Sequence, residues 1–161
     1  MHNLRTIDCL YQSSLWQDCL SQEDIAGVIN AAADHLGISP AFEVSVVLAN
    51  DSFIQSLNDQ YRGKNKPTDV LSFPQENFSK GDVLSIENLN LGDIILSYET
   101  IKRDAESQGK NFIHHVLHMM VHGFLHLMGY DHEDQHEAEE MEALEVFILA
   151  QCGISNPYEL T

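Results

Sequence analysis

Three histidines, His122, His126 and His132, stand at positions i, i+4 and i+10, with Gly129 between the last two. Residues four apart on a helix lie about 40° apart around its axis, so the first two imidazoles point the same way. Glycine commonly ends a helix through a positive φ, which would let the chain bring His132 back beside them. Three neutral imidazoles that meet at one point describe a metal site with an open position for water or substrate. The spacing therefore predicts a hydrolytic metal site rather than a structural one.

The spacing is that of the metzincin signature His-Glu-x-x-His-x-x-Gly-x-x-His, except that Gly123 stands at the glutamate position. That glutamate is the general base of a metallopeptidase. A chain that keeps the ligands and lacks the base is not expected to cleave peptides by that route. A helix whose core histidines have this spacing by chance is the alternative, and the matching glycine at position 129 disfavours it.

Further histidines precede this group at the same spacing, His114 and His118, with His115 beside the first. Each step of four residues drifts by about 40°, so the row spirals and cannot all meet one ion. We expect His118 to be a core residue or a partner of the ligands, and His114 and His115 to be partly exposed without such a role.

Each ligand ring should donate its second N–H to a carboxylate or a carbonyl. Asp131, beside His132, and Asp93, if its strand lies next to the helix, are the candidates. The acidic stretch 133–145 is expected to form a solvated helix face with a favourable negative N-terminus.

Hydrophobic periodicity and capping residues predict the elements that position this group. Strands are expected over residues 5–10, 42–48, 69–73 and 93–96, with a polar loop over 77–90. Helices are expected from the cap Ser21 to Gly37, from Asn50 or Asp51 to Tyr61, from the cap Ser97 to about Ser107, from Asn111 to Met128, and from His136 to Gln151. The pattern predicts an α+β fold, in which a small mixed sheet packs against a central His-bearing helix with several further helices.

Size and composition fit one domain over residues 1–161, because the chain is 161 residues long, 43% apolar, and without repeats or linkers. No apolar run approaches the roughly 18 residues that span a membrane. The start of the chain has acidic and amide residues among its apolar ones and does not resemble a signal peptide. Three cysteines without Cys-x-x-Cys pairing, Cys9, Cys19 and Cys152, indicate buried or free thiols in a reducing cytoplasm.

The histidine block, residues 122–132, resembles the signature of the YbeY family of bacterial rRNA maturation endoribonucleases. Further matching blocks lie at residues 58–64, 68–74, 91–94 and 140–142. The resemblance runs from about residue 43 to 157, with no departure at the ligand positions, whereas the first 40 residues carry no signature.

The resemblance implies a zinc-dependent, single-strand-specific endoribonuclease that acts in 16S rRNA 3′-end maturation and ribosome quality control. His122, His126 and His132 carry over as ligands of one Zn²⁺, and Arg62 as the arginine that faces the metal site. A metal-activated water would then attack an RNA phosphodiester, with single-stranded rRNA, the ribosome or small-subunit assembly proteins as partners. The chemistry of three imidazoles also allows nickel or copper.

Two mechanistic alternatives stay open at this point. Arg62 offers a bidentate fork to charge that develops on a phosphate. Without a glutamate at position 123, either the metal-activated water attacks directly or a carboxylate from elsewhere assists. Direct attack on phosphorus and use of the RNA 2′-OH are likewise both compatible with the residues.

The formal net charge of −17 argues against RNA binding, because nucleic-acid binding normally requires a basic surface. Three of the eight basic residues, Arg62, Lys64 and Lys66, fall within five positions. Such a spot can hold one or two phosphates but not a long strand. We therefore expect weak intrinsic affinity for RNA, with selectivity supplied by a partner.

Other classes of function compete with the nuclease. A metalloprotein that acts as a non-catalytic ribosome-assembly factor would keep the ion for stability alone. A metallopeptidase would need a carboxylate elsewhere in the cleft to replace the missing glutamate. A metal-sensing or storage role is the last alternative, and a single site of three histidines argues against storage.

Overall fold

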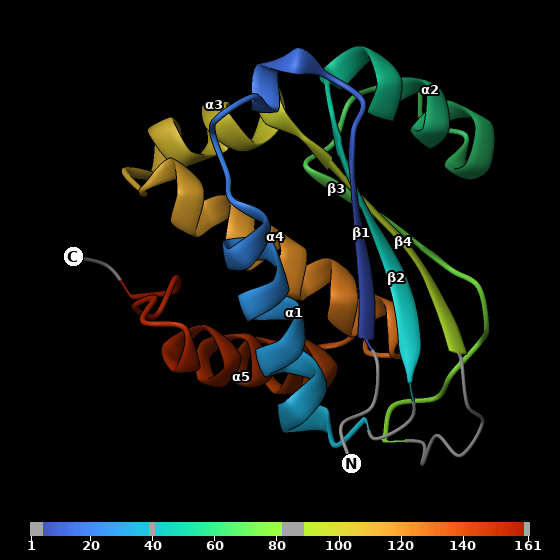
Figure 1. Ribbon diagram of the computed structural model, residues 1–161, viewed down its shortest axis with the longest axis vertical. Coiled ribbons are helices and arrows are strands. Elements are labelled where there is room, and N and C mark those ends of the chain that lie inside the picture. The colour runs from blue at the N-terminus through green and yellow to red at the C-terminus, as the bar shows by residue number, and fades with distance from the viewer. Residues whose placement is uncertain (1–4, 39–40, 82–88, 160–161) are drawn as a thin grey trace.

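The computed structural model describes residues 5–38, 41–81 and 89–159 and shows an α+β fold (Figure 1). The strands are β1 (Arg5–Tyr11), β2 (Phe42–Ala49), β3 (Val70–Pro74) and β4 (Leu89–Ser97). The helices are α1 (Gln22–Leu36), α2 (Asp51–Arg62), α3 (Tyr98–Gln108), α4 (Phe112–Leu127) and α5 (Gln135–Gln151), with a 3₁₀ turn η1 (Ser14–Trp16). The predicted fold class is therefore confirmed.

The sheet is mixed, with its strands in the order β1-β2-β4-β3. β1 and β2 pair in parallel, as do β2 and β4, whereas β3 runs antiparallel to β4. β3 lies at one edge of the sheet, and its residues contact α4. Helix α4 contacts β4 as well, so it packs across this side of the sheet.

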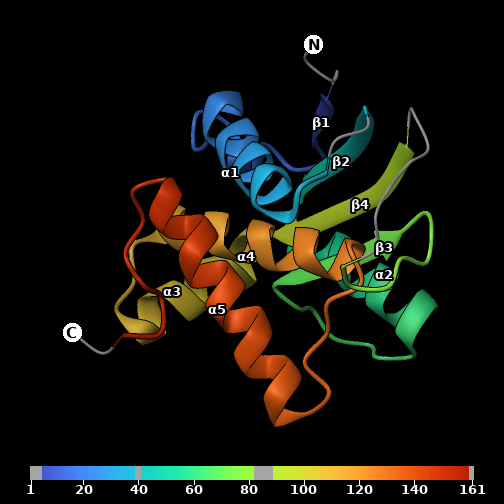
Figure 2. The ribbon, with the colours of Figure 1, turned by 90° about the horizontal axis from the view of Figure 1, so that it is seen from below.

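Alternation along the strands divides the apolar residues between two faces of the sheet. Val44, Val46 and Leu48 of β2 belong to the large core shared with α1, α4 and α5. Ala49 and the intervening Val47 pack instead with residues of α2, β3 and β4 in a small second cluster. Helices α1, α4 and α5 therefore cover one face and α2 the other (Figure 2).

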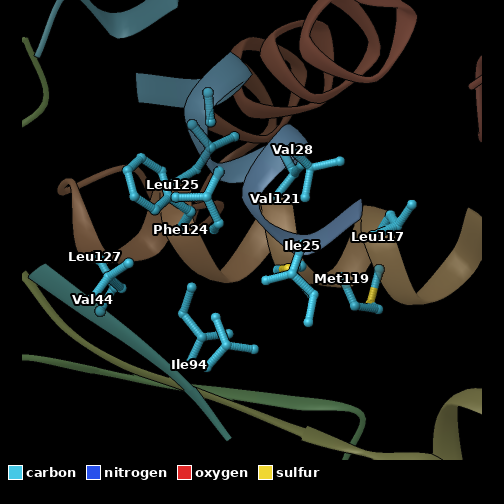
Figure 3. Packing of buried hydrophobic residues seen from close by; sticks show 14 of the residues in the cluster. Ile25, Val28, Val44, Ile94, Leu117, Met119, Val121, Phe124, Leu125 and Leu127 are labelled. Atoms are coloured by element: carbon cyan, nitrogen blue, oxygen red, sulfur yellow. The ribbon is translucent and has the colours of Figure 1, made fainter. Parts of the chain in front are cut away.

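Helix α4 is the centre of the large core and is enclosed on nearly every side. Its apolar residues, among them Val121, Phe124 and Leu125, pack near Ile25 of α1 and Ile94 of β4 (Figure 3). A helix buried all round normally carries only apolar residues. The histidines of α4 therefore need specific partners inside the protein.

The capping residues explain where most helices begin. Ser21 and Asn50 accept hydrogen bonds from the backbone N–H groups of Asp24 and Phe53, as expected for N-caps. Ser97 does occupy the N-cap position of α3, but its side chain makes no cap hydrogen bond. Its hydroxyl donates to Asp51 of α2 at 2.6 Å instead, so it joins two helices.

Strand β4 is longer than expected, because residues Leu89 and Asn90 belong to it rather than to a loop. A shift in register between Glu43 and Val44 of the neighbouring strand interrupts the pairing there. Gly92 has a φ of 122° and lies against the backbone of Phe73, so it also breaks the apolar alternation. Residues 77–81 lie in a loop as predicted, and residues 82–88 of that prediction lie outside the described part of the chain.

Among the described residues, no helix combines the length and the apolar character needed to cross a membrane. The three cysteines are free thiols, each half-buried.

Candidate metal centre

Three histidines predicted from spacing meet at one point beside the sheet edge. The nearest nitrogens of His122, His126 and His132 all lie within 4.8 Å of one another. The Nε2 atoms of His122 and His126 are 3.1 Å apart. The first two rings are half-buried and His132 is exposed, so the group opens to solvent on one side.

Gly129 brings His132 back to the helix, as the sequence predicted. Its φ is 94°, and an added Cβ would lie 2.3 Å from the carbonyl oxygen of Phe78. Beyond it, the Tyr130 N–H donates to the Leu125 carbonyl at 3.0 Å, which closes the helix end with a tight turn. The position therefore requires glycine for both its backbone angle and its close packing.

Gly123 shows why the metzincin glutamate is missing. The position faces the sheet, and an added Cβ would lie 2.8 Å from Ile94 Cγ2 and 3.2 Å from Val70 Cγ2. Its carbonyl oxygen accepts a hydrogen bond from the Ser72 hydroxyl at 2.9 Å. This helix turn packs so closely on β3 and β4 that a glutamate at position 123 would have no room.

The partner of the ligand ring is Glu145 of α5, which the sequence analysis missed. Its Oε2 accepts a hydrogen bond from His122 Nδ1 at 2.6 Å, and its Oε1 accepts one from His118 Nε2 at 2.6 Å. The side chain is fully buried, whereas the acidic stretch 133–145 was expected to be a solvated face. That expectation is wrong for Glu145, because α5 turns this one carboxylate inward. A glutamate among apolar residues of an otherwise acidic helix was the only available signal.

The electrostatics of this group suit metal ligands. Burial alone would raise the pKa of Glu145, but the hydrogen bonds from His118 and His122 outweigh it and hold the pKa at about 2. Burial, together with the neighbouring His122 and His132, lowers the pKa of His126 to about 4. At neutral pH the carboxylate is therefore charged and the His126 ring neutral, which is the form that binds a metal.

A pocket of about 380 Å³ lies over the histidines and includes Arg62 in its lining. Arg62 is the last residue of α2, where Gly63 reverses the chain with a φ of 68°. The Lys64 N–H then donates to the Asn58 carbonyl at 3.2 Å, and the Asn58 side chain donates to the Lys66 carbonyl at 2.9 Å. The structure thus places Arg62 at the pocket, whereas the lysines of the same basic cluster are exposed on the turn beyond it.

The two carboxylates proposed as ring partners do not serve in that way. Asp131 lines the pocket, but its Oδ1 accepts the backbone N–H of His132 at 2.8 Å rather than a ring N–H. Asp93 is exposed on β4. Asp69 also lines the pocket, and its side chain accepts the backbone N–H of Val70 at 2.7 Å.

The remaining histidines of α4 differ in their surroundings. His114 is exposed, as expected, but His115 is buried with only 5% of its surface accessible. Burial, together with the nearby His118 and Lys110, lowers the pKa of His115 to about 4. The expectation of partial exposure is wrong for His115, whose ring packs against that of His118 with centroids 6.0 Å apart, beside a pocket that residues 154–159 also line.

The donor set fits a divalent transition metal. Zinc–nitrogen bonds of about 2.0–2.1 Å in a tetrahedral site hold ligand nitrogens roughly 3.3 Å apart, close to the separation of the two Nε2 atoms. The Glu145 carboxylate engages Nδ1 of His122 and leaves Nε2 as the atom that faces the other rings. Fold and site together define an α+β protein whose three convergent histidines could hold a metal ion in an open pocket.

Comparisons with known proteins agree with this class. The sequence profile described as Endoribonuclease YbeY matches residues 12–153. A protein named Endoribonuclease YbeY from a Bradyrhizobium species is 45% identical, and the match covers 95% of this chain and 92% of that relative. One of the same name from Magnetococcus marinus is 48% identical, and the match covers 74% of this chain and 90% of that relative. A Thermotoga maritima protein solved in solution shares the fold, with a TM-score of 0.58 at 22% identity, and covers 96% of this chain and 100% of its own. The chain belongs to the Endoribonuclease YbeY family.

Proposed function

We propose that this protein is a metal-dependent endoribonuclease that cuts single-stranded RNA, acting in the cytoplasm as one domain on the 3′ end of 16S rRNA and in ribosome quality control. The observation that supports this most is the convergence of His122, His126 and His132 beside Arg62 in one pocket of a chain from this family. Zinc is the proposed ion, because three imidazoles with an open fourth position suit it.

Different residues of the chain have different roles in the proposed cleavage. A divalent ion held by the three histidines would lower the pKa of a water molecule and polarise a phosphoryl oxygen. Arg62 lines the same pocket, where two parallel N–H donors of its guanidinium would bind the phosphate and complement charge that builds up during the reaction. Glu145 keeps His122 in the tautomer that presents Nε2.

A proton acceptor has to come from a residue other than position 123. Two carboxylates line the pocket, those of Asp69 and Asp131. Each accepts a hydrogen bond from the backbone N–H of the next residue, which restrains its side chain at the pocket. Either carboxylate could take a proton from the group that attacks phosphorus, whether that group is a water molecule or the RNA 2′-OH. In the alternative, the metal-activated water attacks directly and neither carboxylate is needed.

The charge of the chain limits how RNA is bound. Arg62 lies at the pocket, and Lys64 and Lys66 are exposed beside it, whereas the chain carries a net charge of −17. A small basic spot attracts one or two phosphates and gives a shallow dependence on salt. We therefore propose weak affinity for free RNA and delivery of the substrate by the ribosome or by small-subunit assembly proteins.

A non-catalytic ribosome-assembly factor is the second candidate, and the acidic surface favours it. In that case the ion would stabilise the fold, and the pocket arginine would be dispensable. A peptidase is disfavoured, because Gly123 packs on the sheet and leaves no space for the glutamate such an enzyme needs.

The test is cleavage of a structured rRNA fragment that carries a single-stranded tail. Metal-loaded wild type is compared with His126→Ala and with the matched control His114→Ala, which removes an exposed histidine of the same helix. Folding and metal content are measured for all three proteins. We expect wild type and the control to cut within the tail. His126→Ala should lose metal and more than about 100-fold of the activity, because loss of a ligand costs more than loss of a residue that only hydrogen-bonds a ligand.

Two other outcomes would reject the nuclease. Equal cleavage by all three proteins would mean that the activity does not depend on the histidine site and comes from a contaminating enzyme. Absence of cleavage by metal-loaded wild type, both alone and on small-subunit particles, would leave the assembly factor as the better account.

A further inference from the structure

The Glu145 carboxylate is held by residues from two different parts of the chain. His118 and His122 of α4 donate to it, and so does the hydroxyl of Tyr158, which lies beyond the end of α5. The rings of His118 and Tyr158 also meet edge to face, with centroids 5.4 Å apart. The segment after α5 thus reaches the outer partner of a metal ligand.

This segment is fixed in place by its own contacts. Ile154 is buried in the large core. The Tyr158 N–H donates to the Asn156 side chain at 2.8 Å, which forms a tight local turn. The Tyr158 hydroxyl is therefore presented to Glu145 by an ordered turn rather than by a loose chain end.

The proton positions follow from the chemistry of the groups. A carboxylate only accepts, so His122 donates from Nδ1 to one oxygen, and His118 and Tyr158 both donate to the other. The Nδ1 atom of His118 is buried and has no hydrogen-bond partner among the described residues, so its contact with Glu145 runs through Nε2 alone.

With both oxygens engaged, the carboxylate cannot turn away from His122. If Oε1 lost its donors, a buried anion would be left partly unpaired, which is costly and favours a different side-chain orientation. Within the described residues no lysine or arginine pairs with Glu145, so the two α4 histidines and Tyr158 alone fix it.

We propose that Tyr158 and His118 are positioning residues of the metal centre, which hold Glu145 so that it orients His122 toward the ion. The inference rests on the proposed metal site and adds the C-terminal segment to it. Removal of the Tyr158 hydroxyl should then weaken metal binding, although Tyr158 is not one of the three histidine ligands.

The experiment measures metal binding without RNA. The variants are Tyr158→Phe and Glu145→Gln, and the matched controls are Tyr11→Phe on β1 and Glu139→Gln on α5, both at exposed positions. The dissociation constant for Zn²⁺ is measured by competition with a chelator, and the coordination geometry by the visible spectrum of the Co²⁺-loaded protein. In the metal-free proteins, proton–nitrogen NMR of the imidazoles reports the tautomer of His122.

We expect Glu145→Gln to weaken Zn²⁺ binding by about 10–100-fold and Tyr158→Phe by a smaller factor, both with an altered Co²⁺ spectrum. In metal-free wild type the His122 proton should lie on Nδ1, and in both variants the Nε2–H tautomer should gain population. The two controls should match wild type throughout.

Unchanged affinity, spectrum and tautomer in a folded Tyr158→Phe protein would overturn the inference. If Glu145→Gln proves too unstable to study, the Tyr158→Phe protein alone tests the inference. Its His122 tautomer can be measured by NMR without any metal. A wild type that binds Zn²⁺ and responds to these substitutions but cuts no RNA would overturn the proposed function and leave this inference standing.

Discussion

The two halves of helix α4 carry histidines at the same four-residue spacing but in different surroundings. At the N-terminal end, His114 is exposed and His115 is buried, and neither ring nitrogen of His115 has a partner among the described residues. At the C-terminal end, His122 and His126 meet His132 beneath an open pocket. The residue type and the spacing are therefore shared, and only one end becomes a candidate metal centre.

The difference comes from what other elements bring to each end. The C-terminal end receives His132 from the turn after Gly129, Arg62 from α2 and, through His122, the carboxylate of Glu145. His118 stands between the two ends and shares that carboxylate. Spacing places side chains on one side of a helix, and the packing of neighbouring elements decides which of them can act.

The largest effect is expected from Gly123→Glu, which restores the metzincin signature. If spacing alone built the site, this change would create a peptidase. Because the position packs on Ile94 and Val70, we expect loss of about 4 kcal/mol or more of unfolding free energy, from steric overlap and a buried charge. Urea unfolding measures this loss, and a protease assay should remain negative.

Gly123→Ala is the control for the steric part of that change, with an expected loss of about 1–3 kcal/mol. A Gly123→Glu protein as stable as wild type would show that the sheet yields at this turn, and the contrast between spacing and packing would then fail.

A second effect, in activity, is expected from Arg62→Gln. Among the described residues the arginine is the only lysine or arginine that lines the pocket over the histidines, so loss of its fork should lower kcat/KM for RNA by about 100–1000-fold while metal content stays the same. Lys64→Gln, two residues later on the exposed turn, is the matched control and should retain most activity. An equal fall in both variants would point to general attraction of RNA instead of a role at the pocket.

The sequence predicted the elements where local rules dominate. The caps Ser21 and Asn50, Gly37 at the end of α1, and the long helix after Asn111 all appear as expected, because these depend on neighbours along the chain. The convergence of the three histidines was also predictable, since the helix and Gly129 are both local features.

Features that depend on distant elements could not be found in this way. Glu145 looked like one more acid on a solvated helix, although it follows Met141 by four residues and precedes Ile148 by three, and both of these are buried. Its contact with the α4 histidines depends on how α5 packs on α4, which the sequence of α5 does not show. The first part of β4 was assigned to a loop, since its irregular pairing with β2 and the glycine at 92 hide the alternation. Tyr158 gave no signal at all, because its contact with Glu145 arises only from the packing of the chain end.

The smallest effect is expected at the other end of α4 and depends on pH. His115 is buried without a partner among the described residues, and its pKa is lowered to about 4. In the unfolded chain its pKa is about 6.5, so the unfolded state binds more protons between these values. The metal-free protein should therefore be fully stabilised above pH 6.5 and lose up to about 3 kcal/mol from this residue as the pH falls to 4.

His115→Phe should remove that share of the acid sensitivity, because phenylalanine cannot take up a proton. Urea unfolding of metal-free wild type and variant between pH 4 and pH 7.5 measures the difference. His115→Gln separates titration from packing, since it should also flatten the pH dependence but be less stable at neutral pH, where its buried amide would lack a hydrogen-bond partner. A variant whose stability falls with acid as steeply as that of wild type would show that His115 finds a partner in solution, and the two ends of the helix would then be more alike than the structure indicates.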